Sequence, residues 1–269
     1  MDILVRADAE ATGLGAWMNV AIFEQHNLTL EIGANPNSLG LIKRLYHLLP
    51  NRLEYAHPLR GHRYLTRRVG GLLAAALSNA TDAAMALVRW HNNRRLQPGW
   101  TLREIDHFDE GSIRTLHDRR RYADHWSLER TASRLNWRLL DNPRGRCRVL
   151  GLFRGSGLEG YMAWRIGRAG DGSRDAHVMD WLVSDAAGDH GFDALLGQLL
   201  RDCVGESVEV VRLTVLHDAT GKALRRWGFR ASSNPYATVG LQSRDMELKR
   251  VLTQGSSWWI TPVDTDLDP

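Results

Sequence analysis

The chain has 269 residues, of which 43% are hydrophobic and 25% are charged. These proportions exclude a wholly disordered chain and a small disulfide-stapled protein, and the length suits one large domain or two modest ones. The longest apolar run, Val69 to Leu77, has nine residues, about half of the ~18 that a membrane span needs. Since no basic and apolar leader opens the sequence, we expect a cytoplasmic protein without a membrane span.

The basic balance of the chain is small. Lys and Arg total 35 against 31 Asp and Glu, which gives a formal net charge of +4. The densest cationic cluster, Arg119–Arg121, is flanked by Asp118 and Asp124, and no basic stripe with interleaved aromatic residues follows it. This pattern is typical of a solvated helix face, so we expect no nucleic-acid partner.

Metal and thiol chemistry have weak support. Cys147 and Cys203 cannot form a four-cysteine zinc site and fit packing thiols in a reducing compartment. No spacing of His, Asp and Glu resembles a metal site, so no metal is expected.

Residues 1–68 predict alternating strands and helices. Asp2–Arg6 is strand-like, and the apolar residues of Leu14–Ile22 recur at helical spacing. Leu28–Ile32 alternates apolar and polar residues, as a half-buried strand does. A turn then precedes a helical stretch, Ser38–Tyr46, and Tyr55–Thr66 can supply one or two further strands.

Residues 69–98 predict an amphipathic linker helix. Its polar face carries no Lys or Arg before Arg89, whereas helices that lie on a membrane usually carry several. A connector packed between two domains is therefore favoured over a membrane-surface helix.

Residues 99–242 predict a second α/β unit. Three strands separated by short glycine-rich turns are typical of an antiparallel meander, and a helix and a strand rich in β-branched residues follow them. The expected elements are strands at 101–107, 148–154, 158–166, 176–183 and 208–216, and helices at 109–118, 128–140, 192–203 and 218–228. Residues 243–269 predict a C-terminal helix, a strand and an acidic tail.

Two segments of the chain are related in architecture. Leu28–Tyr46 and Val210–Gly228 each read as a strand, a small polar turn and a short helix. Leu41 in the first corresponds to Ala223 in the second, an offset of 182 residues (223 − 41). This similarity suggests an internal duplication.

A glycine loop stands between the first predicted strand and helix. Residues 10–15 read Glu-Ala-Thr-Gly-Leu-Gly. The free N–H groups and positive dipole of a helix start attract an anion, and glycine lets a phosphate approach the main chain. The loop matches neither a nucleotide P-loop nor the dinucleotide fingerprint. A glycine-softened turn into the helix is an equally good interpretation.

At this loop the sequence resembles the GNAT acyltransferase superfamily, whose pyrophosphate loop reads Arg/Gln-x-x-Gly-x-Gly/Ala. Gly13 and Gly15 match this pattern, while Glu10 replaces the cation or amide. The resemblance implies that acyl-CoA, most simply acetyl-CoA, is the cosubstrate. The cofactor-binding residues that it implies are Thr12, Gly13, Leu14, Gly15 and Asn37. It further implies Tyr46 as a general acid, with helix-end packing as the alternative role.

Residues 99–242 resemble a complete GNAT fold in element order. The loop before its long helix carries Asp185 and Asp189 but no Gly-x-Gly, and these charges would repel a pyrophosphate. Asp180 lies on the strand that splays beside the thioester in GNAT enzymes, so it is a candidate general base or a satisfied, half-buried carboxylate. His177 and His217 suit proton transfer or a structural role in the same way.

Taken together, these features predict an α/β protein with a GNAT-like mixed, mostly antiparallel sheet flanked by helices. We expect two repeats, the first truncated at its N-terminus, so that its missing strands are supplied by the second repeat, by a partner chain or by coding sequence upstream of Met1. The expected function is acyl-CoA-dependent transfer to a small-molecule amine, and a homodimer is one candidate arrangement. The alternative is a non-catalytic GNAT-like scaffold or ligand-binding protein.

Overall fold

The fold is taken from a computed structural model of the chain. It describes residues 14–60, 96–168, 172–253 and 258–265, together with helical residues 80, 82–84 and 86–87. Most of the predicted linker helix, the predicted strand 2–6 and the last four residues lie outside this part. Within it, no helix is long and apolar enough to cross a membrane.

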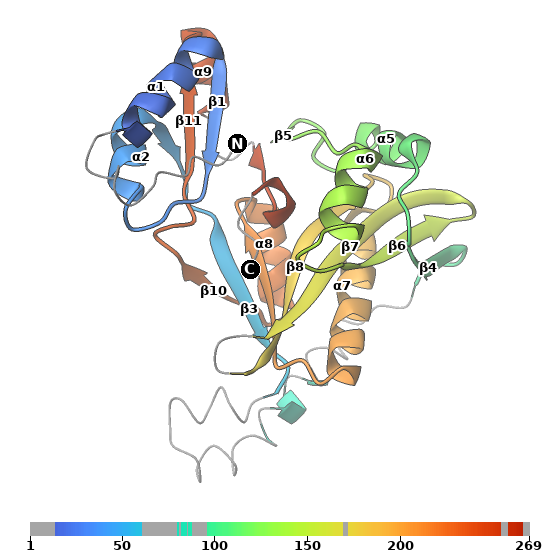
Figure 1. The fold of residues 1–269 in the computed structure, drawn as a ribbon. Helices are drawn as coiled ribbons and strands as arrows, with labels where there is room; N and C mark the ends of the chain where they lie inside the picture. The colour runs from blue at the N-terminus through green and yellow to red at the C-terminus, as the bar shows by residue number, and fades with distance from the viewer. Residues whose placement is uncertain are drawn as a thin grey trace.

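A seven-stranded sheet forms the centre of the larger part of the molecule (Figure 1). Its order is β10-β3-β9-β8-β7-β6-β4, and every neighbouring pair is antiparallel except β8 with β9. The predicted antiparallel meander is therefore confirmed as β6-β7-β8. The strands are β3 (Leu53–Pro58), β4 (Trp100–Glu104), β6 (Arg148–Arg154), β7 (Gly157–Arg168), β8 (Arg174–Val183), β9 (Val210–Val215) and β10 (Arg230–Ser233).

Helices cover both faces of this sheet. The α7 helix (Gly188–Gly205) buries its apolar stripe, as the helical spacing predicted, in one core with α8 (Asp218–Arg226). The opposite face carries α5 (Glu110–Asp118) and α6 (Ala132–Leu135), which continues into a π-helical turn, Asn136–Leu140. The arrangement confirms the predicted mixed α/β class with a mostly antiparallel sheet.

A smaller sheet stands beside the large one. Its order is β1-β11-β2, with both pairs antiparallel. A separate apolar core joins this sheet to the C-terminal helix and to Trp258 and Ile260. The elements are α1 (Leu14–Gln25), β1 (Leu28–Ile32), α2 (Leu39–Leu45), β2 (His47–Leu49), β11 (Val239–Ser243) and α9 (Met246–Leu252).

The two sheets exchange one strand each. The N-terminal strand β3 lies between β9 and β10 in the large sheet, and the C-terminal strand β11 lies between β1 and β2 in the small sheet. The series α1-β1-α2-β2-β3 thus repeats the order of α7-β9-α8-β10-β11, with the last strands interchanged. This topology favours the duplication hypothesis. The unit boundaries at residues 68, 98 and 242 stay predictions, and each sheet draws strands from both sides of them.

The C-terminal segment packs against the large sheet and forms a separate two-stranded sheet. The short strand β12 (Trp258–Trp259) pairs in parallel with β5 (Trp126–Ser127), and a 3-10 turn, Pro262–Asp264, follows. Trp258 and Trp259 of β12 are both buried. The predicted final strand is confirmed, and it is held inside the molecule.

Candidate functional site

The parallel strands β8 and β9 diverge within the large sheet. They pair only through Asp175–His177 and Val210–Arg212. Beyond this point β8 continues beside β7, and β9 continues beside β3. We call the space between β8 from Val178 and β9 from Leu213 the fork. The backbone of each strand turns one edge toward it, so the fork is the place where a ligand can meet the sheet.

At its wide end the fork is filled by aromatic side chains. The buried ring of Trp259 lies 5.4 Å from that of Trp181, 5.3 Å from that of His217 and 6.1 Å from that of Tyr122, measured between ring centroids. Trp259 belongs to the core beneath α7 and α8. This side of the fork is therefore closed by the C-terminal segment.

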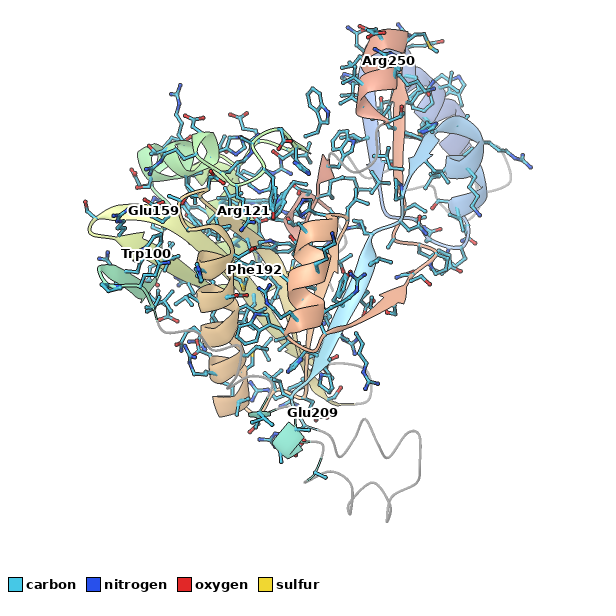
Figure 2. The ribbon with its side chains drawn as sticks, turned by 180° about the vertical axis from the view of Figure 1, so that it is seen from behind. Trp100, Arg121, Glu159, Phe192, Glu209 and Arg250 are labelled. Carbon is cyan, nitrogen blue, oxygen red and sulfur yellow. The ribbon has the colours of Figure 1, made fainter. Side chains whose placement is uncertain are left out.

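A second segment covers the end of β8. The amide of Arg121 donates to the carbonyl of Val183, and the amide of Asp185 donates to the carbonyl of Arg119, both at 2.8 Å. The amide of Ser184 points the other way, toward Glu159 of β7. Figure 2 shows Arg121 and Phe192 close to the N-terminal end of α7. The open edge is thus already hydrogen-bonded at Val183, the last residue of β8, and at Asp185 just beyond it.

The loop at the start of α7 fits a diphosphate poorly. The amides of Ala187 and Gly188 both donate to Ser184. Asp189 forms an ion pair of 2.8 Å with Arg121, which offsets its charge. Because the amides of Ala187 and Gly188 are engaged and Asp185 adds negative charge, this helix start is a weaker site for a pyrophosphate than an open glycine loop.

A cavity of about 270 Å³, lined by both charged and apolar side chains, opens at the narrow end of the fork. His177, Val178, Arg212 and Thr214 border it, at the point where the strands separate. Loops of the small sheet and the C-terminal segment close it from the other side. The remaining lining residues are Ala34, Arg52, Glu54, Asn234, Tyr236, Ala237, Pro262 and Thr265.

The charges around this cavity are unevenly matched. Arg212 donates 2.8 Å and 2.9 Å hydrogen bonds to Asp175 and Glu54. Arg52 is 4% exposed, and its guanidinium has neither a hydrogen bond nor an ion pair with any described residue. Burial lowers the pKa of Arg52 to about 10, and the negative charge of Asp264 partly opposes this decrease. Arg52 therefore stays charged at neutral pH.

His177 is a neutral polar group in the same cavity. Burial, and then the positive charge of Arg212, lowers the pKa of its imidazole. A neutral imidazole can accept a proton. The position of His177 at the fork is compatible with the proton-transfer role that the sequence left open, whereas His217 accepts a hydrogen bond from the amide of Thr220 and caps α8.

Asp180, a predicted catalytic residue, lies outside this cavity in a buried network. Its carboxylate receives hydrogen bonds from Arg130, Tyr161 and Thr261. The side chain is fully buried. This geometry favours the role of a hydrogen-bonded structural carboxylate for Asp180 over that of a general base. The side chain is completely buried, whereas the sequence predicted it to be half-buried.

Tyr46, the second predicted catalytic residue, belongs to the small-sheet unit. It follows α2, is 7% exposed, and its hydroxyl donates a 2.8 Å hydrogen bond to Asn19 Oδ1 of α1. Burial, followed by the negative charge of Glu31, raises its pKa. The hydroxyl is thus protonated at neutral pH, as a general acid must be, and it also ties α1 to α2. It does not line the cavity at the fork.

The predicted cofactor loop is described in part. The α1 helix begins at Leu14, so Leu14 and Gly15 form its first residues as expected, while Thr12 and Gly13 lie outside the described residues. Asn37 is exposed in the turn before α2, where its amide donates to Asn35 Oδ1. Leu14, Gly15, Asn37 and Tyr46 share one unit, and Asp180 lies in the other.

Comparison with known proteins gives similarity in structure only. No protein-family model and no curated protein sequence matches the chain. An Enterococcus faecalis V583 protein of unknown function, described as a probable N-acyltransferase, aligns with a TM-score of 0.54 and 14% identity over 89% of this chain and 51% of that chain. A GCN5-related N-acetyltransferase from Anabaena variabilis ATCC 29413 aligns with a TM-score of 0.53 and 12% identity over 90% of this chain and 52% of that chain. Saccharomyces cerevisiae N-myristoyltransferase with bound myristoyl-CoA aligns with a TM-score of 0.56 and 9% identity over 88% of this chain and 60% of that chain.

This chain therefore spans about half of the first two proteins and 60% of the third. At these identities the similarity establishes the fold. The chain has the fold of the GNAT N-acyltransferases, as its resemblance to that superfamily implied.

Proposed function

We propose that this protein is an acyl-CoA-dependent N-acyltransferase that transfers an acetyl group to a small-molecule amine. The observation that carries the proposal is the fork: two parallel strands of a GNAT fold separate, and a cavity with charged side chains in its lining lies at the point of separation. We place the activity in the cytoplasm, without a nucleic-acid partner, and a homodimer stays a prediction.

The small-sheet unit is the proposed acyl-CoA site. Its helix α1 starts at Leu14. The amides of Thr12, Gly13 and Gly15 are proposed to donate to the diphosphate. Asn37, in the turn before α2, is a further proposed cofactor contact. The loop at α7, by contrast, has its first amides bonded to Ser184. Acyl-CoA would supply an activated thioester carbonyl, and a glycine loop that holds its diphosphate fixes where that carbonyl lies.

The proton transfers are assigned to side chains that can perform them. As the amine forms its bond to the carbonyl carbon and the carbon–sulfur bond breaks, one proton leaves the amine and one reaches the thiolate. His177, neutral and exposed to the cavity, is the proposed acceptor for the first. Tyr46, whose raised pKa keeps it protonated, is the proposed donor for the second. Asp180 is assigned a structural role, because its carboxylate is fully hydrogen-bonded within the buried network.

Calorimetric titration with acetyl-CoA tests the cofactor site. We expect saturable heat with the full chain, and its loss in Gly13→Asp, because a carboxylate placed in the loop repels the diphosphate. Gly157→Asp is the matched control: it adds the same charge at the exposed first residue of β7, where a Cβ meets only the Arg154 carbonyl at 3.5 Å. Undiminished binding by Gly13→Asp would refute the assigned loop.

A non-catalytic GNAT-like scaffold is the second candidate. It is favoured by the filling of the fork by Trp259 and by the engaged amides of Ala187 and Gly188. This alternative predicts no heat with acetyl-CoA even at high protein concentration, and no release of free thiol from acetyl-CoA in the presence of any amine.

A further inference from the structure

The guanidinium of Arg52 poses a problem of free energy. A buried ion without a partner is strongly destabilising, and buried arginines in folded proteins are normally paired. Arg52 is 96% buried by its 4% exposure, and Nε has no hydrogen-bond partner. Its backbone amide is satisfied by the carbonyl of Ala237, so the main chain is not the cause. The charge of Asp264 acts on the guanidinium without a described ion pair, so a counter-charge in direct contact can come from a molecule that enters the cavity.

The neighbouring groups define the chemistry of that ligand. Glu54 lies in β3, two residues after Arg52. Its Oε1 accepts a hydrogen bond from Arg212, and no described residue hydrogen-bonds its Oε2. Asp175 is likewise paired with Arg212. A phosphate or diphosphate would therefore meet two carboxylates beside Arg52, the lining cation without a described ion pair. A ligand with one carboxylate and an adjacent amino group suits the arrangement better, since guanidinium binds carboxylate in a planar fork.

The cavity has room for a ligand larger than a single ion. A volume of about 270 Å³ corresponds to roughly nine water molecules at about 30 Å³ each. A halide ion would leave most of this space to water. Asn234, Tyr236 and Thr214 add amide and hydroxyl groups to the lining, which suit a polar organic molecule.

We infer that the cavity at the fork binds an α-amino acid, or the terminal residue of a short peptide, with its carboxylate on Arg52 and its amino group on Glu54 Oε2. Resting on the proposed function, this inference makes the acceptor of acyl transfer a carboxylate-bearing amine whose nitrogen lies beside His177 at the separation of β8 and β9.

Thermal unfolding of the full chain provides the first test. Each of the twenty L-amino acids is added at millimolar concentration, with and without acetyl-CoA, and the best of them is then titrated by calorimetry. We expect at least one to raise the melting temperature, because a ligand that binds the folded state stabilises it. Its carboxamide, which keeps the amino group but loses the negative charge, should bind at least about tenfold more weakly.

Arg52→Met and Arg250→Met form the matched pair of variants. Arg52→Met preserves the bulk of the side chain, should abolish the amino-acid shift, and should melt no lower than the unliganded parent because it removes an unpaired buried charge. Arg250 lies on the surface of α9, paired with Glu247, and does not line the cavity (Figure 2). Its replacement should leave the shift intact.

Three results overturn the inference: no L-amino acid stabilises the chain under either condition, the carboxamide binds as well as the acid, or Arg52→Met retains the shift. Stabilisation by inorganic phosphate alone also overturns it, in favour of a phosphate site. Amino-acid binding at Arg52 without any acetyl-CoA binding leaves the inference standing and refutes the proposed acyltransferase. Acetyl-CoA binding without amino-acid binding refutes the inference and leaves the proposed acyltransferase standing.

Discussion

Arg130 donates two hydrogen bonds to Asp180, from Nε and from Nη2, each 3.2 Å long. Both side chains are buried, and the hydroxyls of Tyr161 and Thr261 donate to the same carboxylate. Burial, reinforced by the charge of Asp180, raises the pKa of Tyr161, which keeps that hydroxyl a donor. Each oxygen of Asp180 thus accepts two hydrogen bonds. The pair joins β8 to the loop before α6 and to the C-terminal segment.

Replacing Asp180 by Asn should mainly cost stability. The substitution leaves the Arg130 guanidinium buried without its principal counter-charge, and breaking a buried pair in this way costs about 3–5 kcal/mol in free energy of unfolding. Urea denaturation measures it. Asp106→Asn is the control, because the pair of Asp106 with Arg146 is exposed and such pairs contribute little. Unchanged stability together with lost acyl transfer would instead support Asp180 as the general base.

Asp264 predicts a pH dependence of stability. Its carboxylate shares the Arg130 guanidinium with Asp180, at 2.9 Å from Nη2. Burial raises its pKa above the ordinary 3.8, an effect that Arg130 opposes and Asp180 reinforces. The folded state therefore holds this proton more tightly than the unfolded state does. The stabilisation is complete below pH 3.8 and is lost as pH rises through the folded pKa.

The measurement compares the parent with Asp264→Asn, which cannot titrate at this position. The difference in unfolding free energy, parent minus variant, should fall as pH is raised from about 4 toward neutrality. Asp264→Asn should also cost less at pH 7 than Asp180→Asn, because Arg130 donates two hydrogen bonds to Asp180 and one to Asp264. A difference that rises with pH would show that the pairing with Arg130 outweighs burial.

Local elements of this fold could be predicted from the sequence, and strand pairing could not. The α1 helix begins at Leu14 and β1 spans Leu28–Ile32, as their periodicity predicted, because side-chain spacing reports which face is buried. The exchange of β3 and β11 joins residues more than 150 positions apart, such as Tyr55 with Leu213. No local pattern encodes such a partner. The short strands β2 and β10 were missed for the same reason.

The candidate site shows the same division. Asp180, Tyr46 and the residues of the glycine loop are visible in sequence because a family motif or a strand position marks them. Arg52 is one of many arginines, and its distinguishing property is the lack of a partner in a buried position. That property exists only once β3, the loop at 234–237 and the C-terminal segment have come together.

Two glycines of the small-sheet unit should respond oppositely to alanine. A Cβ on Gly240 of β11 would stand 2.9 Å from Cβ of Tyr46, which is packed in place, so Gly240→Ala should lower the unfolding free energy by about 1–3 kcal/mol. Gly40, exposed on α2, has nothing within 4 Å, and Gly40→Ala should raise it by about 0.4–1 kcal/mol. Chemical denaturation compares them. Equal effects would mean that β11 does not pack against Tyr46.

Both cysteines should be unreactive in the folded protein. Cys147 and Cys203 are buried as free thiols, and burial, followed by the charge of Glu206, raises the pKa of Cys203 to about 12. Since the thiolate is the reactive form, a disulfide reagent at pH 8 should label neither thiol natively and both in urea. Rapid labelling of the native chain would require one thiol to be open to solvent.

Trp259 offers a test of the filled fork. Its ring is 7% exposed and packs on Trp181, so Trp259→Ala should leave a cavity between β8 and β9 and cost about 3–5 kcal/mol in unfolding free energy. Trp137→Ala, which removes an equally large side chain at a position 58% exposed, should cost far less. Hydrogen exchange adds a local readout, since the amide of Arg121, bonded to Val183 at this end of the fork, should exchange faster in Trp259→Ala. If the two tryptophan variants are equally stable and exchange at Arg121 is unchanged, the C-terminal segment does not hold the fork closed.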